Sequence, residues 1–291
     1  ARAVAQPLFA FLQLLEQPKV ARYLSHVARH QAAGAASDPA LSHHVMRRRQ
    51  DAASLGLCAF MADHRDVYIV SAVRTPIGCF QGALKSQTAV DLGVAAAKAA
   101  IERANIQPTD IQEALIGCVL QAQLGQSPAR QVALRAGCPP STDATTVNKV
   151  CASGMKCVAL GAQSIRLGEN EVILAGGMES MSRAPYYLQR GLMFGDASLS
   201  DAVLHDGLTD ALSQQHMGQC ADQSAEKHGV TRADQDAYAI QSYERAAEAW
   251  KTGKFADEIV PITVTEKRAQ TVVAEDEEYH KFRPEKMSTL R

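Results

Sequence analysis

The sequence predicts an α/β fold in which a largely parallel sheet is layered with helices, and two observations lead to it. From Asp66 onward, short apolar or β-branched runs alternate with longer segments that carry helix-capping signals and an apolar face. Because parallel strands need a crossover connection, which is usually a helix, this alternation is typical of a parallel sheet. After Ser182 the chain becomes more polar and richer in turns, which predicts a separate, inserted subdomain.

Four strands are expected in residues 66–182. Each is a short run of apolar or β-branched residues that ends at a turn or leads directly into a helix. The predicted strands cover residues 67–70, 115–120, 145–150 and 172–175.

Three helices are expected between and after these strands. Thr88, with Asp91 three residues later, forms a capping box that starts a helix over residues 88–104. Ser127 followed by Pro128 places a cap and a first-turn proline on a helix that ends at Gly137. The third helix, residues 152–167, begins as soon as the preceding strand ends.

Residues 183–291 contain one strongly marked helix. Thr231 and Asp234 form its capping box, and Gly253 ends it. Its predicted apolar stripe consists of Ala237, Ile240, Tyr243 and Ala247.

Composition limits the classes of function. The 291 residues include 30 basic and 31 acidic side chains, so the net charge of −1 offers no general attraction for nucleic acid. No apolar run approaches the ~18 residues of a membrane-spanning helix. We therefore expect neither nucleic acid nor membrane as a partner. The seven cysteines are dispersed without a Cys-x-x-Cys pair, which fits a reducing compartment where thiols fill cores or act as catalysts.

A cysteine stands where the predicted strand 145–150 leads into the predicted helix 152–167, in the run Val-Asn-Lys-Val-Cys-Ala-Ser-Gly-Met-Lys. The unpaired amides and the dipole at a helix N-terminus favour an anion, and the thiolate is the reactive form of cysteine. Small residues follow Cys151 and leave room for a substrate carbonyl. Cys151 is therefore a candidate nucleophile, and a buried, inert cysteine is the alternative that these residues alone leave open.

Several long motifs, in order, carry a resemblance to the thiolase family. Residues 72–78 (Ala-Val-Arg-Thr-Pro-Ile-Gly) resemble its opening motif, and residues 147–156 resemble its nucleophile motif. Residues 175–182 (Ala-Gly-Gly-Met-Glu-Ser-Met-Ser) resemble the Gly-rich turn that follows. The resemblance continues through residues 206–210, 216–218 and 257–261.

This resemblance implies a thiolase-like layered α/β core, in its N-terminal half only, with an inserted α+β loop subdomain that binds coenzyme A. The expected division is a targeting or disordered extension at 1–65, the core half at 66–182 and the inserted subdomain at 183–291. The implied activity is that of an acetyl-CoA C-acetyltransferase, an enzyme of the acetoacetyl-CoA thiolase type. It condenses two acetyl-CoA molecules to acetoacetyl-CoA, and catalyses the reverse thiolysis, through an acetyl thioester on Cys151.

The resemblance also implies which residues bind substrate. His216 before Met217 is similar to the short-chain enzymes, and both would line the acyl pocket while Leu208 packs along the pantetheine. Tyr243 matches a position that contacts coenzyme A and, in mitochondrial members, a potassium ion. No other cofactor is expected. The adenine and phosphates would lie against the cationic and aromatic run Lys281, Phe282, Arg283 and Lys286.

The sequence departs from the family in one large respect. The Asn-Glu-Ala-Phe, Gly-His-Pro and Cys-x-Gly motifs, which supply an oxyanion-organising Asn, the activating His and the second Cys, do not occur here. We expect the sequence to be an incomplete portion of an active enzyme. The alternatives are a 3-ketoacyl-CoA thiolase of β-oxidation and a truncated, non-catalytic acyl-CoA-binding protein. The family also implies a homo-oligomer, either a tetramer or a dimer.

The first 65 residues are basic and poor in acids. Residues 1–50 hold seven basic side chains and two acidic ones, and they show no steady apolar period. This composition predicts a mitochondrial presequence removed before Asp66. One alternative is a cytosolic protein whose translation starts at Met61. The other is a peroxisomal signal around residues 19–27, because Lys19-Val20 and His26-Val27 loosely resemble the family's N-terminal signal.

Overall fold

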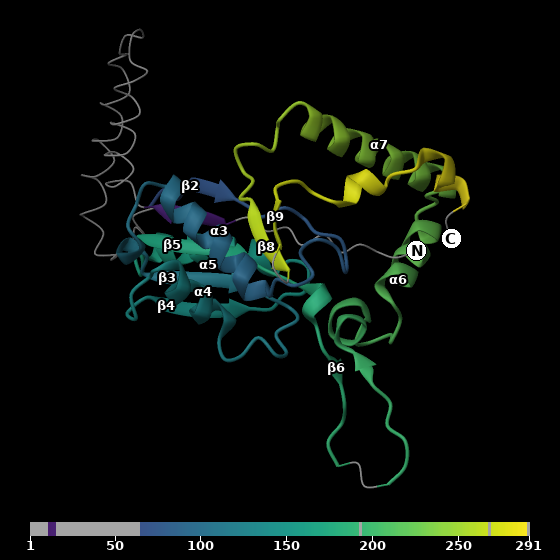
Figure 1. The fold of residues 1–291 in the computed structure, drawn as a ribbon, viewed down its shortest axis with the longest axis horizontal. Coiled ribbons are helices and arrows are strands. Elements are labelled where there is room, and N and C mark those ends of the chain that lie inside the picture. The colour runs from purple at the N-terminus through teal and green to yellow at the C-terminus, as the bar shows by residue number, and fades with distance from the viewer. Residues whose placement is uncertain (1–10, 16–64, 192–193, 267–268, 290–291) are drawn as a thin grey trace, which may run out of the picture.

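The computed structural model describes residues 11–15, 65–191, 194–266 and 269–289, and a five-stranded sheet lies at the centre of its core (Figure 1). The strands follow the order β2-β1-β5-β3-β4 across the sheet. β3 runs parallel to β4 and β5, whereas β1 runs antiparallel to its neighbours β2 and β5. The strands are β1 (Phe11–Leu15), β2 (Tyr68–Val73), β3 (Glu113–Gly117), β4 (Asp143–Val147) and β5 (Val172–Gly177).

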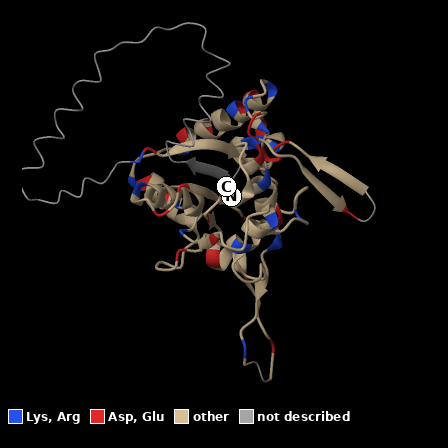
Figure 2. Ribbon diagram, turned by 90° about the vertical axis from the view of Figure 1, so that its left-hand side faces the viewer, with Lys and Arg blue, Asp and Glu red and all other residues tan. Residues whose placement is uncertain are grey.

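Helices cover both faces of the sheet. α3 (Ala89–Arg103) and α4 (Pro128–Ala136) pack on one face, and α5 (Ser153–Leu167) packs on the other. Side chains alternate between the two faces, so Ile116 of β3 lies in the core under α3 and α4 while Leu115 packs with α5. Charged positions lie mainly on helices and connecting segments, and the strands carry few of them (Figure 2). The predicted layered α/β fold is therefore present.

Two strands end earlier than their apolar runs suggested. The predicted strand 115–120 corresponds to β3, which ends at Gly117, and the predicted strand 145–150 corresponds to β4, which ends at Val147. The apolar residues beyond β3 serve tertiary packing instead, since Leu120 packs against Val203 and Leu208. Periodicity cannot distinguish a buried strand residue from a buried loop residue that follows it.

The helix signals were correct at α3 and partly wrong at α4. The capping box of Thr88 and Asp91 is present at the start of α3. Ser127 occupies the N-cap position of α4, but it is in the left-handed conformation and its side chain makes no capping bond. Thr146 of β4 supplies the missing acceptor, because its hydroxyl accepts a hydrogen bond of 3.0 Å from the amide of Ala129. A neighbouring strand therefore caps this helix.

The structure corrects the expectation for residues 1–65 at one place. We expected a targeting or disordered extension here, yet β1 lies in the interior of the sheet, paired with both β2 and β5. Its sequence, Phe-Leu-Gln-Leu-Leu, is an apolar run within an otherwise basic segment. β2 and β5 would each expose unpaired backbone groups if the position between them had no strand. The rest of the predicted extension, residues 1–10 and 16–64, lies outside the described residues.

The remainder of the chain is built on two helices and two small ribbons beside the core (Figure 1). β8 and β9 form a ribbon whose apolar side packs on Leu84 and Leu92. None of the helices described is long and apolar enough to cross a membrane. The elements are β6 (Tyr186–Tyr187), β7 (Ser200–Asp201), a π-helix (Val203–Leu208), α6 (Met217–Lys227), α7 (Arg232–Lys251), β8 (Ile262–Glu266) and β9 (Ala269–Val273). Single 3-10 turns cover 108–110, 181–183, 278–281 and 284–289.

α7 confirms its predicted ends but not its predicted stripe. Thr231 and Asp234 form the capping box, and Gly253 adopts the left-handed conformation just after the helix. Ile240 and Tyr243 are half-buried as expected, whereas Ala237 and Ala247 are exposed. α6 was not predicted, because its sequence is polar overall.

A partly buried ion-pair network attaches the C-terminal segment to the core. Arg74, just after β2, lies 2.7 Å from the carboxylate of Asp276 and 2.5 Å from that of Glu258. Asp276 also accepts hydrogen bonds from the amide of Ile77 and the indole of Trp250. The side chains of Arg74 and Asp276 are each only 13% exposed. Removing one member of such a pair leaves the other charge buried without its partner.

We therefore expect Arg74→Met to lower the free energy of unfolding by about 3 kcal/mol, since it leaves Asp276 buried and uncompensated. Arg135→Met is the matched control: its ion pair with Asp91 is 51% and 36% exposed, and its loss should change stability by less than ~1 kcal/mol. Urea unfolding of both variants measures the difference. Equal losses in the two variants would show that the Arg74 network is not a stabilising link.

Candidate active site

Three neighbouring parallel strands end at one edge of the sheet, and α5 begins there. β3 ends at Gly117, β4 at Val147 and β5 at Gly177. Pairing continues just past these ends: the amide of Cys118 donates to the carbonyl of Val147, and that of Met178 donates to Gly117. In layered α/β folds, ligands bind in the crevice outside the carboxyl ends of the strands. This edge is therefore the expected place for a site.

The first turn of α5 touches the strand ends through backbone atoms. A Cβ on Gly117 would lie 2.6 Å from the nitrogen of Gly154, a distance that real Cβ atoms do not show. A Cβ on Gly177 would lie 3.2 Å from the Cα of Gly154. At position 117 only glycine allows this approach, which fixes the beginning of α5 against the sheet.

Cys151 lies in the turn between β4 and α5, and its side chain is exposed. The residue before it, Val150, has a φ of 49°, in the left-handed region. This conformation costs a β-branched residue about 1–3 kcal/mol, and such residues are concentrated at functional sites. Cys151 is therefore not the buried cysteine of the alternative, and its reactivity stays a prediction.

Burial raises the pKa of four other thiols, those of Cys79, Cys118, Cys138 and Cys157, and so makes them poor nucleophiles. Desolvation raises the pKa of Cys138 to about 11 and that of Cys157 to about 12. The pKa of Cys118 is raised further, by burial and then by the neighbouring carboxylate of Glu179. A raised pKa leaves less thiolate at neutral pH, and the thiolate is the reactive form.

Glu179 organises the loop after β3, a role that the sequence did not reveal. Its carboxylate accepts hydrogen bonds from the amides of Val119, at 2.8 Å, and Leu120, at 3.2 Å. Burial raises the pKa of Glu179, while these amide hydrogen bonds oppose the shift. Leu120 packs against Leu208, so Glu179 indirectly fixes a residue predicted to contact pantetheine. A carboxylate two residues after a fully buried strand was the available signal.

His216 and Met217 begin α6. The Nδ1 atom of His216 accepts a 3.0 Å hydrogen bond from the amide of Gly218, so the ring caps the helix. In the neutral ring the hydrogen is then carried by Nε2. A backbone bridge joins His216 to Thr209, immediately after Leu208. The three predicted pocket residues therefore lie along one connected segment, although their contacts with an acyl group stay a prediction.

Tyr243, Phe282 and Lys281 meet around Glu278. The rings of Tyr243 and Phe282 stack with centroids 4.8 Å apart and planes inclined by 4°. The hydroxyl of Tyr243 donates to Glu278 at 3.2 Å, and the ammonium of Lys281 lies 3.6 Å from the other carboxylate oxygen. Burial and the charge of Glu278 raise the pKa of Tyr243. The structure thus brings together three of the residues predicted to bind coenzyme A.

Arg283 and Lys286 are exposed and stand apart from this cluster. The guanidinium of Arg283 donates to the carbonyls of His280 and Phe282, so it folds back on its own backbone. Lys286 lies in the last 3-10 turn. Their contacts with phosphate remain a prediction.

A potassium ion at Tyr243 also stays a prediction. Among the described residues, the phenol of Tyr243 is hydrogen-bonded to the carboxylate of Glu278, and the ammonium of Lys281 lies 3.6 Å from that carboxylate and offsets its charge. Cations of this kind need more oxygen ligands than these two. The described residues near Tyr243 do not by themselves fit the ion.

The family model described as "Thiolase, N-terminal domain" matches residues 67–291. The chain belongs to the thiolase family. The acetyl-CoA acetyltransferase of Yarrowia lipolytica is 51% identical over 224 residues, which cover 77% of this chain and 56% of that relative. The mitochondrial acetyl-CoA acetyltransferase of Mus musculus is 50% identical over 228 residues, covering 78% of this chain and 54% of the relative. The thiolase chain thus spans just over half the length of these relatives.

A solved thiolase structure has the same fold. The crystal structure of Acat5 thiolase from Ascaris suum in complex with coenzyme A matches with a TM-score of 0.74 and 46% sequence identity. The match covers 78% of this chain and 58% of that one. The predicted family and the thiolase-like layered fold are confirmed.

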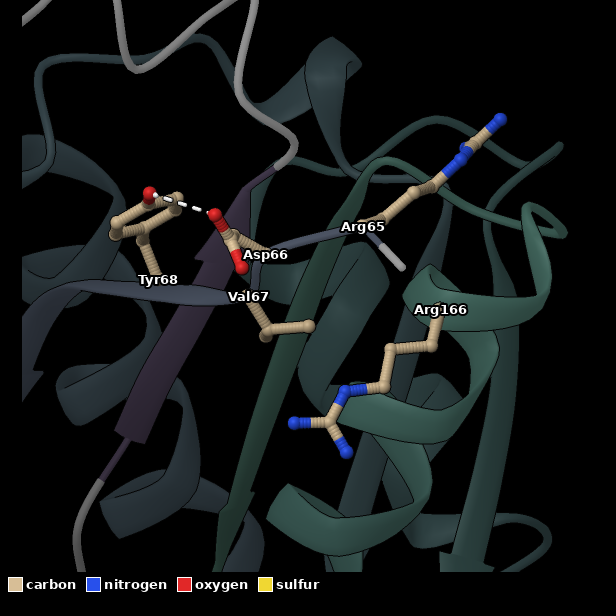
Figure 3. Close-up of a pocket in the computed structure, with 5 residues that line it drawn as sticks. All are labelled: Arg65, Asp66, Val67, Tyr68 and Arg166. Carbon is tan, nitrogen blue, oxygen red and sulfur yellow. Dashed lines mark hydrogen bonds between the residues drawn. The ribbon is translucent and has the colours of Figure 1, made fainter. Parts of the chain in front are cut away.

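A polar cavity elsewhere on the thiolase chain is not part of this site. It has a volume of about 620 Å³ and lies at the start of β2 and the last turn of α5, the opposite end of that helix from Cys151 (Figure 3). The hydroxyl of Tyr68 donates to the carboxylate of Asp66 at its rim. The lining residues are Arg65, Asp66, Val67, Tyr68 and Arg166.

Among the thiols that the structure describes, Cys151 should be alkylated first. It is exposed, Cys220 is half-buried, and burial raises the pKa of Cys79, Cys118, Cys138 and Cys157. Brief iodoacetamide treatment of the folded protein near neutral pH, followed by peptide mapping, measures the order. If Cys157 were labelled before Cys151, the assignment of Cys151 as the nucleophile would be wrong. Cys58 lies outside the described residues, and its peptide is scored separately.

Proposed function

We propose that the protein is an acetyl-CoA C-acetyltransferase that carries its acetyl group on Cys151. The observation that carries the proposal is the place of this thiol. It is exposed on a hydrogen-bonded turn at the carboxyl edge of the sheet, where α5 begins. Relatives about 50% identical are named acetyl-CoA acetyltransferases, and a similar structure holds coenzyme A. These relatives support the acetoacetyl-type enzyme over the long-chain β-oxidation enzyme.

The reaction would proceed in two steps at this thiol. The thiolate of Cys151 attacks the carbonyl carbon of acetyl-CoA, and coenzyme A leaves as its thiolate, which takes up a proton. A second acetyl-CoA loses a methyl proton to a base, and the resulting carbanion attacks the thioester. Acetoacetyl-CoA is released and the Cys151 thiolate is restored. Thiolysis follows the same steps in reverse.

We assign substrate binding to two groups of residues. Leu208, His216 and Met217 would line the acyl and pantetheine end, because a backbone bridge and the Leu120–Leu208 contact hold their segment beside the end of β3. The stacked pair of Tyr243 and Phe282, with Lys281 beside it, would receive the nucleotide end. Arg283 and Lys286 would supply further positive charge to the phosphates.

The enzyme should cleave acetoacetyl-CoA well and 3-ketohexadecanoyl-CoA poorly if His216 and Met217 close the acyl end. One methylene in an apolar pocket is worth only ~1–3 kcal/mol, so strong discrimination requires a steric wall. Steady-state kinetics of the protein expressed from its complete reading frame gives kcat/KM for both substrates. Cys151→Ala is the control: it should abolish acetyl transfer and retain coenzyme A binding. Comparable values for the two substrates would favour the β-oxidation enzyme.

We propose that the enzyme is a homo-oligomer and that its β6–β7 arm takes part in the contact. The arm projects away from the core (Figure 1), and its exposed apolar side chains include Leu188, Phe194 and Leu199. Phe194 is 98% exposed, and Leu188 and Leu199 on the same arm are 54% and 62% exposed, so the arm carries several exposed apolar side chains rather than a single one.

Phe194→Ser should therefore lower the molar mass of the assembly in light scattering, because it removes apolar area from the contact. Leu212→Ser is the matched control, because Leu212 is 94% exposed and lies outside the arm. An unchanged molar mass of the Phe194→Ser assembly would show that the arm does not contribute to the interface.

We propose a mitochondrial location, supported by the basic composition of residues 1–50 and by several relatives named mitochondrial. Residues 1–65 fused to a fluorescent reporter should direct it into mitochondria and be removed. A punctate peroxisomal signal would favour the peroxisomal alternative. A diffuse, uncleaved reporter would favour translation from Met61 and a cytosolic enzyme.

A further inference from the structure

The turn that carries Cys151 contains an unusual backbone conformation. Six residues other than glycine have a positive φ in the described part of the chain, and Val150 is the β-branched one among them. A β-branched side chain crowds its own backbone in this region. Some local structure must therefore keep Val150 there, immediately before the nucleophile.

Asn148 holds the amide side of Val150. Its side-chain oxygen accepts a 3.0 Å hydrogen bond from the amide of Val150, two residues later. This is the arrangement in which an asparagine side chain mimics a backbone turn. Asn148 follows directly after β4, so its position is set by the sheet.

Ser153 holds the carbonyl side of Val150. Its hydroxyl donates to the carbonyl of Val150 at 2.6 Å and accepts from the amide of Lys149 at 2.8 Å. The amide of Ser153 donates to the same carbonyl at 3.1 Å. Ser153 is buried and lies against Gly117, so this hydroxyl is itself fixed by the sheet edge.

We propose that Asn148 and Ser153 are positioning residues that keep Val150 in the left-handed conformation and thereby set the direction of the Cys151 thiol. The two side chains bond to the peptide groups on both sides of Val150, and Cys151 is the next residue along the chain. If Val150 moved to an ordinary conformation, the path into α5 would change and the thiol would turn toward a different place. The proposal rests on the role proposed for Cys151, but the thiol itself reports on it.

The experiment is a double-mutant cycle on the full chain, read out as the alkylation rate of Cys151. Asn148→Ala should lower this rate about tenfold, because Val150 loses the bond that supports its strained conformation. Val150→Gly should change the rate by less than about twofold, because glycine adopts a positive φ without that crowding. In a Val150→Gly background, Asn148→Ala should also change the rate by less than about twofold.

Two further measurements keep the result interpretable. The buried thiols Cys118 and Cys157 must remain slow to label, which shows that each variant is folded. If Asn148→Ala unfolds the chain, Asn148→Ser replaces it, because a hydroxyl at this position makes the same bond more weakly. It should lower the rate by about threefold, and that loss should vanish in the Val150→Gly background.

Equal losses with Val150 and with Val150→Gly, or no loss at all, would overturn the proposal. A failure of acetyl transfer alone would not overturn the positioning proposal, because the alkylation rate of Cys151 does not depend on that activity. The two outcomes therefore separate the positioning of Cys151 from its proposed function.

Discussion

The close approach of α5 to the ends of β3 and β5 is the constraint on which the site depends. Gly117 and Gly154 touch through backbone atoms, and a single methyl group on Gly117 would force them apart. The contact sets the start of α5, and with it the packing of Cys157 and Ile165 against the sheet. It also sets the turn before the helix, where Cys151 is exposed. One steric requirement thus governs both a core layer and the position of the nucleophile.

A second constraint is electrostatic and joins the two parts of the molecule. Three successive carboxylates reach different partners: Asp276 pairs with Arg74, Glu277 accepts from the amides of Cys79 and Ala83, and Glu278 binds Tyr243. The stacked pair proposed to receive the nucleotide is therefore held by the segment that is anchored just after β2. These carboxylates are partly buried and hydrogen-bonded, so leaving any of them without its partner would be costly.

Features that depend on neighbours in sequence could be predicted, and features that depend on distant residues could not. The capping boxes of α3 and α7 and the cysteine before α5 are local patterns, and all three are present. The cap on α4 comes from Thr146, whose hydroxyl accepts a hydrogen bond from an amide seventeen residues earlier in the chain. Glu179 and Asp276 bind groups about 60 and 200 residues away, a separation that no local pattern encodes.

β1 places a physical condition on the predicted removal of residues 1–65. The strand pairs on one side with β2 and on the other with β5, so its loss would expose backbone donors and acceptors on both neighbours. β1 runs antiparallel to both of its neighbours, and a strand that replaced it would have to run in the same direction as β1. A chain that loses this segment must therefore fill the gap with another strand, or else separate β2 from the sheet. Because Arg74 follows β2 directly, separation would also release the carboxylates that anchor the C-terminal segment. Removal of the N-terminal segment would therefore affect how well the proposed nucleotide site is held, because both depend on the strand between β2 and β5.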